Sequence, residues 1–192
     1  LMGRGAFPDG HELCLEMPGM HGNYTATTSI QKSDLLIAIG VRFDDRVTAN
    51  PSFFAQNAKV IHADIDPAEI GKVREAQVPI VGDAKSVILG LIDALQDEEL
   101  DTKNWINELN SMKTEHPLSY NQDENGPLKV PFVLEELQDL TEEGAIVVSG
   151  VGQHQMWISQ HWNFTEPNTW LNSGGLGTMG YSLPAAIGAK TA

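Results

Sequence analysis

The feature that most constrains the fold is an alternation of short apolar runs with helical patterns along the chain. Residues 35–39 (LLIAI) and 60–65 (VIHADI) read as buried parallel strands, and residues 78–81 read as a third short strand. Asp83 begins a helix on which apolar residues recur at three- and four-residue spacing, and its side chain is a natural N-cap. This order predicts an α/β fold, with parallel sheets, helices on both faces, and ligands at the carboxyl ends of the strands.

The second half of the chain repeats this alternation. Pro131 suits the first turn of a helix that we expect to end at Gly144, and residues 145–149 form the next buried strand. A short strand over residues 170–172 then leads into a glycine-rich turn at residues 174–180. The repetition predicts a second α/β domain.

The stretch between the two halves is rich in acidic and polar residues. Residues 102–115 can form a solvated helix, and the acidic run before it reads as a solvated face rather than a binding site. We therefore expect a first domain over residues 1–97, an interdomain linker over residues 98–128, and the start of a second domain over residues 129–192.

Charge and composition exclude several classes of partner. The chain of 192 residues has 12 Lys and Arg against 26 Asp and Glu, a net charge of −14, which repels nucleic acid and anionic membranes. Its single cysteine, Cys14, cannot form an internal disulfide, and no apolar run is long enough to span a bilayer. A cytoplasmic location is expected, or an organelle if a targeting segment has been removed. The ends at Leu1 and Ala192 lead us to expect a piece of a longer polypeptide.

Two sets of residues suggest ligand sites in the first half. Gly40 ends the first strand, and Arg42 and Asp44 on the following loop offer donors and acceptors to a pyrophosphate or a flavin edge. Asp64 ends the second strand, where doubly wound sheets place an acid that accepts hydrogen bonds from ribose hydroxyls. The spacing alone leaves open a salt-bridged surface loop for the first set and a simple helix cap for Asp64 and Asp83.

Two glycine-rich turns suggest a diphosphate site in the second half. In residues 150–154 (GVGQH), a strand, a turn and a helix N-terminus can present backbone amides to a diphosphate. In residues 174–180 (GGLGTMG), four of seven residues are glycine, which favours close approach by a flat ligand over a purely structural turn.

Taken together, these motifs and several further strings resemble a known family, the acetohydroxyacid synthases (acetolactate synthases) among the thiamine-diphosphate-dependent enzymes. The matching strings run collinearly along almost the whole chain: PGMHG at 18–22, KSDLL at 32–36, GVRFDDRVT at 40–48, DIDPAEIGK at 64–72, GVGQHQMW at 150–157 and SGGLGTMGYSLPAAIG at 173–188. Ala49 departs from the family pattern, which has glycine there, and Pro18 stands where leucine is common. Both departures lie in loops.

The resemblance implies a Rossmann-like middle domain that binds FAD, followed by the start of a domain that binds thiamine diphosphate. The FAD positions that it implies are Pro18, Gly19, Met20, His21, Gly40, Val41, Arg42, Phe43, Asp44, Asp64, Ile65, Asp83 and Ala84. The thiamine diphosphate positions are Val151, Gly152, Gln153, His154, Gly177, Thr178 and Met179, with Met179 as the shelf that bends the cofactor. Asp45 and Arg46 match positions that contact inhibitors at the substrate channel.

The family's catalytic glutamate belongs to an N-terminal domain without a counterpart here, and its Mg²⁺ ligands would lie beyond Ala192. We therefore expect the fragment by itself to lack activity. For the complete enzyme the resemblance implies decarboxylation of pyruvate and ligation to a second 2-ketoacid, on the route to valine, leucine and isoleucine. It also implies a homodimer or homotetramer and a possible regulatory small subunit. A pyruvate oxidase-like enzyme and a non-catalytic nucleotide-binding or assembly module remain the alternatives.

Overall fold

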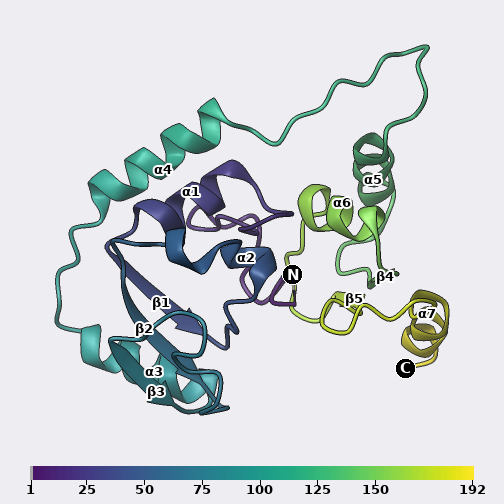
Figure 1. Cartoon of the computed structure of the whole chain (residues 1–192). Coiled ribbons are helices and arrows are strands. Elements are labelled where there is room, and N and C mark those ends of the chain that lie inside the picture. The colour runs from purple at the N-terminus through teal and green to yellow at the C-terminus, as the bar shows by residue number, and fades with distance from the viewer. Residues whose placement is uncertain (1) are drawn as a thin grey trace. The chain divides into compact units, whose positions relative to one another are not determined.

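The chain forms two compact units (Figure 1). A computed structural model describes residues 2–192. The three-stranded unit consists of Pro18–Met20 and Tyr24–His116, and the two-stranded unit consists of the residues up to Met17, His21–Asn23 and Pro117–Ala192. The domain boundaries that the sequence predicts at residues 97 and 128 refer to the domains of the family, so they stay a prediction.

The three-stranded unit contains a parallel sheet in the order β1-β2-β3. Its strands are β1 (Leu35–Ile39), β2 (Lys59–Asp64) and β3 (Val78–Val81), close to the predicted bounds. The other elements of this unit are α1 (Tyr24–Lys32), α2 (Asp45–Thr48), the 3-10 helix η1 (Pro51–Phe53), α3 (Ala84–Leu95) and α4 (Lys103–Glu115). Parallel pairing brings the carboxyl ends of all three strands to one edge of the sheet.

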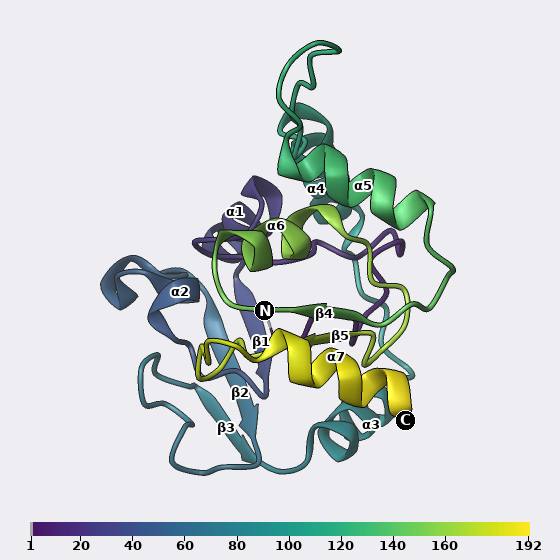
Figure 2. The ribbon, with the colours of Figure 1, turned by 90° about the vertical axis from the view of Figure 1, so that its right-hand side faces the viewer.

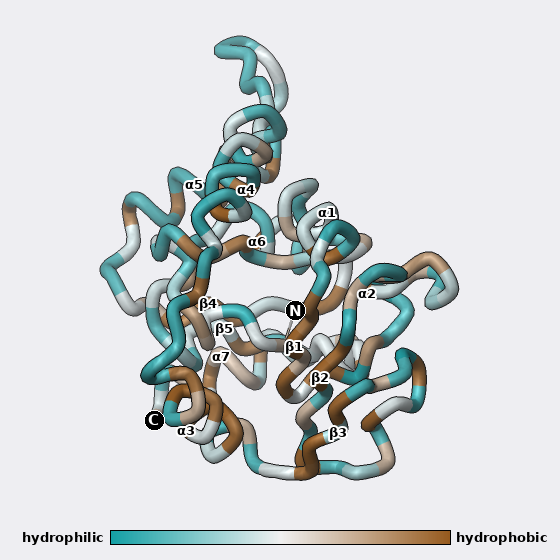
Figure 3. Tube along the Cα trace, turned by 90° about the vertical axis from the view of Figure 1, so that its left-hand side faces the viewer, coloured by the Kyte–Doolittle hydropathy of each residue, from teal (hydrophilic) through white to brown (hydrophobic). Residues whose placement is uncertain are grey.

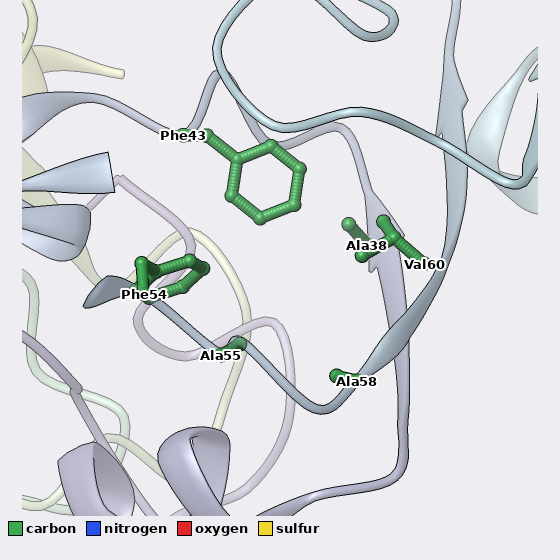
Figure 4. Packing of buried hydrophobic residues seen from close by; sticks show 6 residues of the cluster. All are labelled: Ala38, Phe43, Phe54, Ala55, Ala58 and Val60. Atoms are coloured by element: carbon green, nitrogen blue, oxygen red, sulfur yellow. The ribbon is translucent and has the colours of Figure 1, made fainter. Parts of the chain in front are cut away.

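The core of this unit lies on one side of β1 and β2. Its buried members are Ala38, Phe43, Phe54, Ala55, Ala58 and Val60 (Figure 4). Burial of a side chain as large as phenylalanine stabilises the fold by about 1.5–3 kcal/mol, so Phe43 and Phe54 are principal contributors. Apolar residues are concentrated along the strands (Figure 3), but Leu35 and Ile37 are exposed in this chain. The expectation that β1 is buried along its whole length is therefore wrong.

Helix α4 forms where a solvated helix was expected, and it packs against α1. Leu109 and Met112 are buried. The Lys32 ammonium lies 2.7 Å from a Glu108 carboxylate oxygen, and the rings of Tyr24 and His116 are 3.9 Å apart between centroids. The segment predicted as a linker thus contains a helix that belongs to the three-stranded unit.

The two-stranded unit pairs β4 (Val147–Ser149) with β5 (Trp170–Asn172) in parallel. Its helices are α5 (Val130–Asp139), α6 (Gln153–His161) and α7 (Ser182–Thr191), and both α6 and α7 pack against β4 (Figure 2). The buried cluster is Ile158, Phe164 and Trp170, in which the Phe164 and Trp170 rings stack with centroids 5.1 Å apart.

Helix α5 begins as Pro131 predicts but ends at Asp139, so the predicted end at Gly144 is wrong. The turn at Leu140 and Thr141 closes on the carbonyl groups of the last helical turn. Gly144 adopts a positive φ of 78° five residues later, beyond the end of the helix. None of the helices in residues 2–192 is long and apolar enough to cross a membrane.

A buried ion pair lies within the N-terminal segment, and its aspartate also bonds the loop after α6 in the two-stranded unit. Arg4 Nη1 lies 2.6 Å from Asp9 Oδ1, and the two side chains are only 5% and 2% exposed. Asp9 Oδ2 accepts a hydrogen bond from the Phe164 amide at 2.7 Å, and the Arg4 guanidinium lies 5.7 Å from the Phe164 ring centroid. No sequence pattern predicted this pair.

Ala49 has a backbone conformation that suits glycine. It follows α2 with φ 51° and ψ −110°, in the region where a Cβ is strained. Such a conformation costs of order 1–3 kcal/mol for a residue with a Cβ. Glycine avoids this strain but loses more backbone entropy on folding, which offsets about 0.5–1 kcal/mol of the gain. Ala49→Gly is expected to stabilise the full-length protein by about 1 kcal/mol in thermal unfolding. Ala94→Gly inside α3 is the matched control and should destabilise it by about 1 kcal/mol; equal losses in both variants would contradict the prediction.

Candidate cofactor sites

The first candidate site lies at the carboxyl edge of the three-stranded sheet. Gly40 follows β1 with φ 64°, and its amide donates to the Ala63 carbonyl at 2.8 Å. Apart from Gly40 and its two chain neighbours, no atom of residues 2–192 lies within 4 Å of where a Cβ on Gly40 would stand, so this turn leaves open space at the edge. Asp64 ends β2 at the same edge, and Asp83 follows β3. The structure therefore brings the strand-end residues of the predicted FAD site together.

The two acids at this edge also have local roles. Asp64 Oδ1 accepts a hydrogen bond from the Asp66 amide at 2.9 Å, which forms a turn after β2. Asp83 Oδ2 accepts from the Ser86 amide at 3.1 Å and caps α3, with Ala84 as the first helical residue. The N-cap predicted for Asp83 is confirmed. Ile65 is exposed beside Asp64, where it can contact a ligand at the sheet edge.

The loop after Gly40 is ordered by its own charged residues. Asp44 Oδ1 accepts from the Arg46 amide at 3.0 Å, and Asp44 Oδ2 lies 3.4 Å from Arg42 Nη2. Arg46 Nη1 lies 2.6 Å from Asp45 Oδ1, and this hydrogen bond lowers the pKa of the Asp45 carboxyl. Phe43 points into the core, so only its backbone is available to a ligand. The salt-bridged loop, which the sequence left as an alternative, is present.

The loop from Pro18 to Met20 lies against the loop around Arg46. The Met20 amide donates to the Arg46 carbonyl at 2.8 Å, and the Gly19 amide donates to Thr27 Oγ1 at 3.1 Å. A Cβ on Gly19 would stand 2.4 Å from the Arg46 carbonyl oxygen, so only glycine fits there. His21 belongs to the two-stranded unit, where its carbonyl accepts from Gln160 Nε2 at 3.0 Å.

The second candidate site lies at the N-terminus of α6. Gly152 is the N-cap with φ 147°, and within the described chain no side chain caps the helix. A Cβ on Gly150 or Gly152 would approach the His154 ring to 3.2 Å, so both glycines allow that ring to fold against the turn. The amides of Gln153 and His154 lie in the first turn of α6, where a diphosphate is stabilised by a helix dipole.

The glycine-rich turn lies beside this helix N-terminus. The Thr178 amide donates to Ser173 Oγ at 3.0 Å, and the Gly177 amide donates to the Ser173 carbonyl at 2.8 Å. Gly177 has φ 66°, and a Cβ on it would lie 3.9 Å from Val151 Cγ1. Residues predicted to contact thiamine diphosphate from two separate strings are therefore neighbours. Met179 is 92% exposed, so it is not a core methionine in this chain.

The residues of both sites fit the groups predicted for them. The open turn at Gly40 and the acids at the sheet edge fit a dinucleotide. The uncapped N-terminus of α6, the positive φ of Gly152 and the adjacent glycine-rich turn fit a diphosphate.

Sequence reasoning missed two polar side chains close to these sites. Gln160 holds the His21 carbonyl, and nothing in the sequence relates the two positions. His62 is fully buried and contacts two loops at the sheet edge. A polar residue inside the otherwise apolar run VIHA is the signal that could have found it.

Two models of known protein families match this chain. Residues 1–91 match the family model described as the central domain of thiamine pyrophosphate enzymes. Residues 150–192 match the model of the C-terminal domain of these enzymes, which binds thiamine pyrophosphate. The chain belongs to the family of thiamine pyrophosphate enzymes.

Within this family, the chain is similar to acetolactate synthases. The chain is 54% identical over 196 residues to an acetolactate synthase of Mycobacterium leprae, an alignment that covers 100% of this chain and 31% of that protein. It is 51% identical over 193 residues to the acetolactate synthase large subunit of Corynebacterium glutamicum, with 99% and 31% covered. A chloroplastic acetolactate synthase of Nicotiana tabacum is 48% identical over 193 residues, with 98% and 29% covered. The chain thus spans about a third of the length of these relatives, and the predicted resemblance is confirmed.

Proposed function

We propose that this chain is part of an acetolactate synthase and supplies its flavin platform and half of its thiamine diphosphate platform. The observation that carries the proposal is the pair of glycine turns at strand ends, within a chain that is about half identical to acetolactate synthases along its whole length. The complete enzyme decarboxylates pyruvate and joins the product to a second 2-ketoacid, either pyruvate or 2-ketobutyrate.

The chain's own residues bind and orient the two cofactors. Gly152, Gln153 and His154 would hold the diphosphate at the N-terminus of α6, and Gly177 and Thr178 would offer backbone groups beside it. Met179 presents an exposed side chain from the same turn. When bound, thiamine diphosphate supplies a thiazolium ring that stabilises negative charge at the reacting carbon. Mg²⁺ would be held by residues outside this chain.

The flavin residues bind FAD in a structural role. Arg42 and Asp44 would face its pyrophosphate or flavin edge, Asp64 would accept from ribose hydroxyls, and the open turn at Gly40 would allow close approach. Asp45 and Arg46 line the path of the substrate. The complete enzyme works as a homo-oligomer, with a possible regulatory subunit, in the cytoplasm or in an organelle.

The decisive experiment measures the full-length enzyme with pyruvate. Acetolactate formation that requires thiamine diphosphate and Mg²⁺, without net change of the flavin spectrum, supports the proposal. Reduction of the bound flavin by pyruvate would instead identify a pyruvate oxidase-like enzyme. FAD binding without turnover would identify a non-catalytic nucleotide-binding module.

Arg42 provides a sharper test of the flavin platform. Arg42→Ala in the full-length enzyme is expected to weaken FAD binding about tenfold to a hundredfold, because a charge-assisted hydrogen bond contributes about 1.5–3 kcal/mol. Its ion pair with Asp44 is exposed, so the melting temperature of the apoenzyme should change little. Lys32→Ala, which removes a similarly exposed pair with Glu108, is the control and should leave FAD affinity unchanged. Equal flavin retention by wild type and Arg42→Ala would refute this role.

A further inference from the structure

His62 is the most completely buried polar side chain in the three-stranded unit that has no role in the proposed chemistry. It lies on β2, where it is 0% exposed. The Phe43 ring lies edge-on to its imidazole, with centroids 5.0 Å apart. A polar ring in such a place is costly unless its nitrogens have hydrogen-bond partners.

Both ring nitrogens of His62 have backbone partners. Nε2 lies 2.8 Å from the Val41 carbonyl oxygen, and the Gly71 amide donates to Nδ1 at 3.4 Å. A carbonyl can only accept, so Nε2 carries the proton and Nδ1 is the acceptor. The partners assign this tautomer, and a flipped or doubly protonated ring would lose the contact with Gly71.

The two partners lie on different loops at the carboxyl edge of the sheet. Val41 is in the loop after β1, between Gly40 and Arg42, and Gly71 is in the loop after β2, which begins with Ile65 directly after Asp64. One side chain thus joins two segments that carry seven of the thirteen predicted FAD positions, Gly40 to Asp44 after β1 and Asp64 with Ile65 at the end of β2. An apolar residue in this core could pack as well, but it would hold neither loop.

We infer that His62 is a positioning residue of the flavin site, which sets the spacing of the loops after β1 and β2 through Val41 and Gly71. The inference rests on the proposed function, because it assigns a task to His62 only if those loops bind FAD. The His62 side chain contacts two predicted FAD positions, the Val41 carbonyl by a hydrogen bond and the Phe43 ring by edge-on packing.

The test compares His62→Phe, His62→Gln and Val60→Ala in the full-length apoenzyme. FAD affinity is measured from the quenching of flavin fluorescence, and stability is measured from the melting temperature without FAD. His62→Phe keeps a ring but loses both hydrogen bonds, so its Kd for FAD should rise about tenfold. The amide nitrogen of glutamine can replace Nε2, so His62→Gln should recover most of the affinity. Val60→Ala, a buried neighbour on the same strand, should lower the melting temperature and leave the Kd within about twofold.

Three outcomes decide the matter. If His62→Phe and Val60→Ala lower the melting temperature alike and both keep the wild-type Kd, His62 only packs and the inference is overturned. If His62→Phe does not fold, His62→Gln is compared with His62→Asn instead. Both variants carry an amide, but the shorter side chain of asparagine cannot reach the Val41 carbonyl. Equal Kd values for these two would overturn the inference, and weaker binding by His62→Asn would support it. If the wild-type enzyme binds no FAD, the proposed flavin platform fails and the inference fails with it.

Discussion

Replacing Asp9 by asparagine is expected to destabilise the full-length enzyme by about 3–5 kcal/mol, the typical cost of breaking a buried ion pair from one side. The Arg4 and Asp9 side chains are almost fully buried and their charged atoms are 2.6 Å apart. Asparagine keeps the shape but leaves the Arg4 charge without its counter-charge, and among residues 2–192 Arg4 Nε already has no hydrogen-bond partner. Urea unfolding of wild type and variant measures the loss.

An exposed pair of nearly the same length is the matched control. Lys32 and Glu108 are 2.7 Å apart, but their side chains are 53% and 46% exposed. Glu108→Gln is expected to cost only about 0–1 kcal/mol, because water already solvates both charges. The double variant Arg4→Met/Asp9→Leu should recover most of the loss, since it removes both buried charges. Similar small losses for Asp9→Asn and Glu108→Gln would show that burial does not control the strength of the pair.

If the Met179 side chain bends the bound cofactor, shortening it is expected to raise the activation free energy by several kcal/mol. This increase lowers kcat on the order of a hundredfold or more. Met179 lies in the glycine-rich turn beside the N-terminus of α6 and is almost fully exposed in this chain. Its surface is therefore available to a cofactor, which a core methionine would not be. Met179→Leu keeps the bulk and should keep most of the rate.

The measurements for Met179 are kcat, the Kd of thiamine diphosphate and the melting temperature of the full-length enzyme. Met179→Ala should lower kcat far more than it weakens cofactor binding, because the side chain selects a conformation rather than adding affinity. Leu176→Ala in the same turn is the control, since Leu176 is 94% exposed and has no predicted cofactor contact. An alanine variant at Met179 that melts early but turns over normally would show that the residue only packs.

The elements of the fold were largely predictable, because periodicity and strand-end signals are local. The strands at residues 35–39, 78–81 and 170–172 were predicted with their observed bounds, and the N-cap at Asp83 was predicted from its position before an apolar helix. The predictions that were wrong concern the end of a helix and the burial of a strand. Helix α5 ends at Asp139, and Leu35 and Ile37 of β1 are exposed. A helix end and the covering of a strand both depend on what packs against them.

The sequence by itself determined the α/β class, the order of strands and helices, and the glycines that follow the strands. These properties follow from side-chain periodicity and from the backbone freedom of glycine, which act over a few residues. Only the tertiary structure decided that Arg4 pairs with Asp9 in a buried setting, that Val151 lies beside Gly177, and that His62 joins two loops. These contacts join segments that are apart in the chain or depend on burial, and burial sets the strength of a charge or a hydrogen bond.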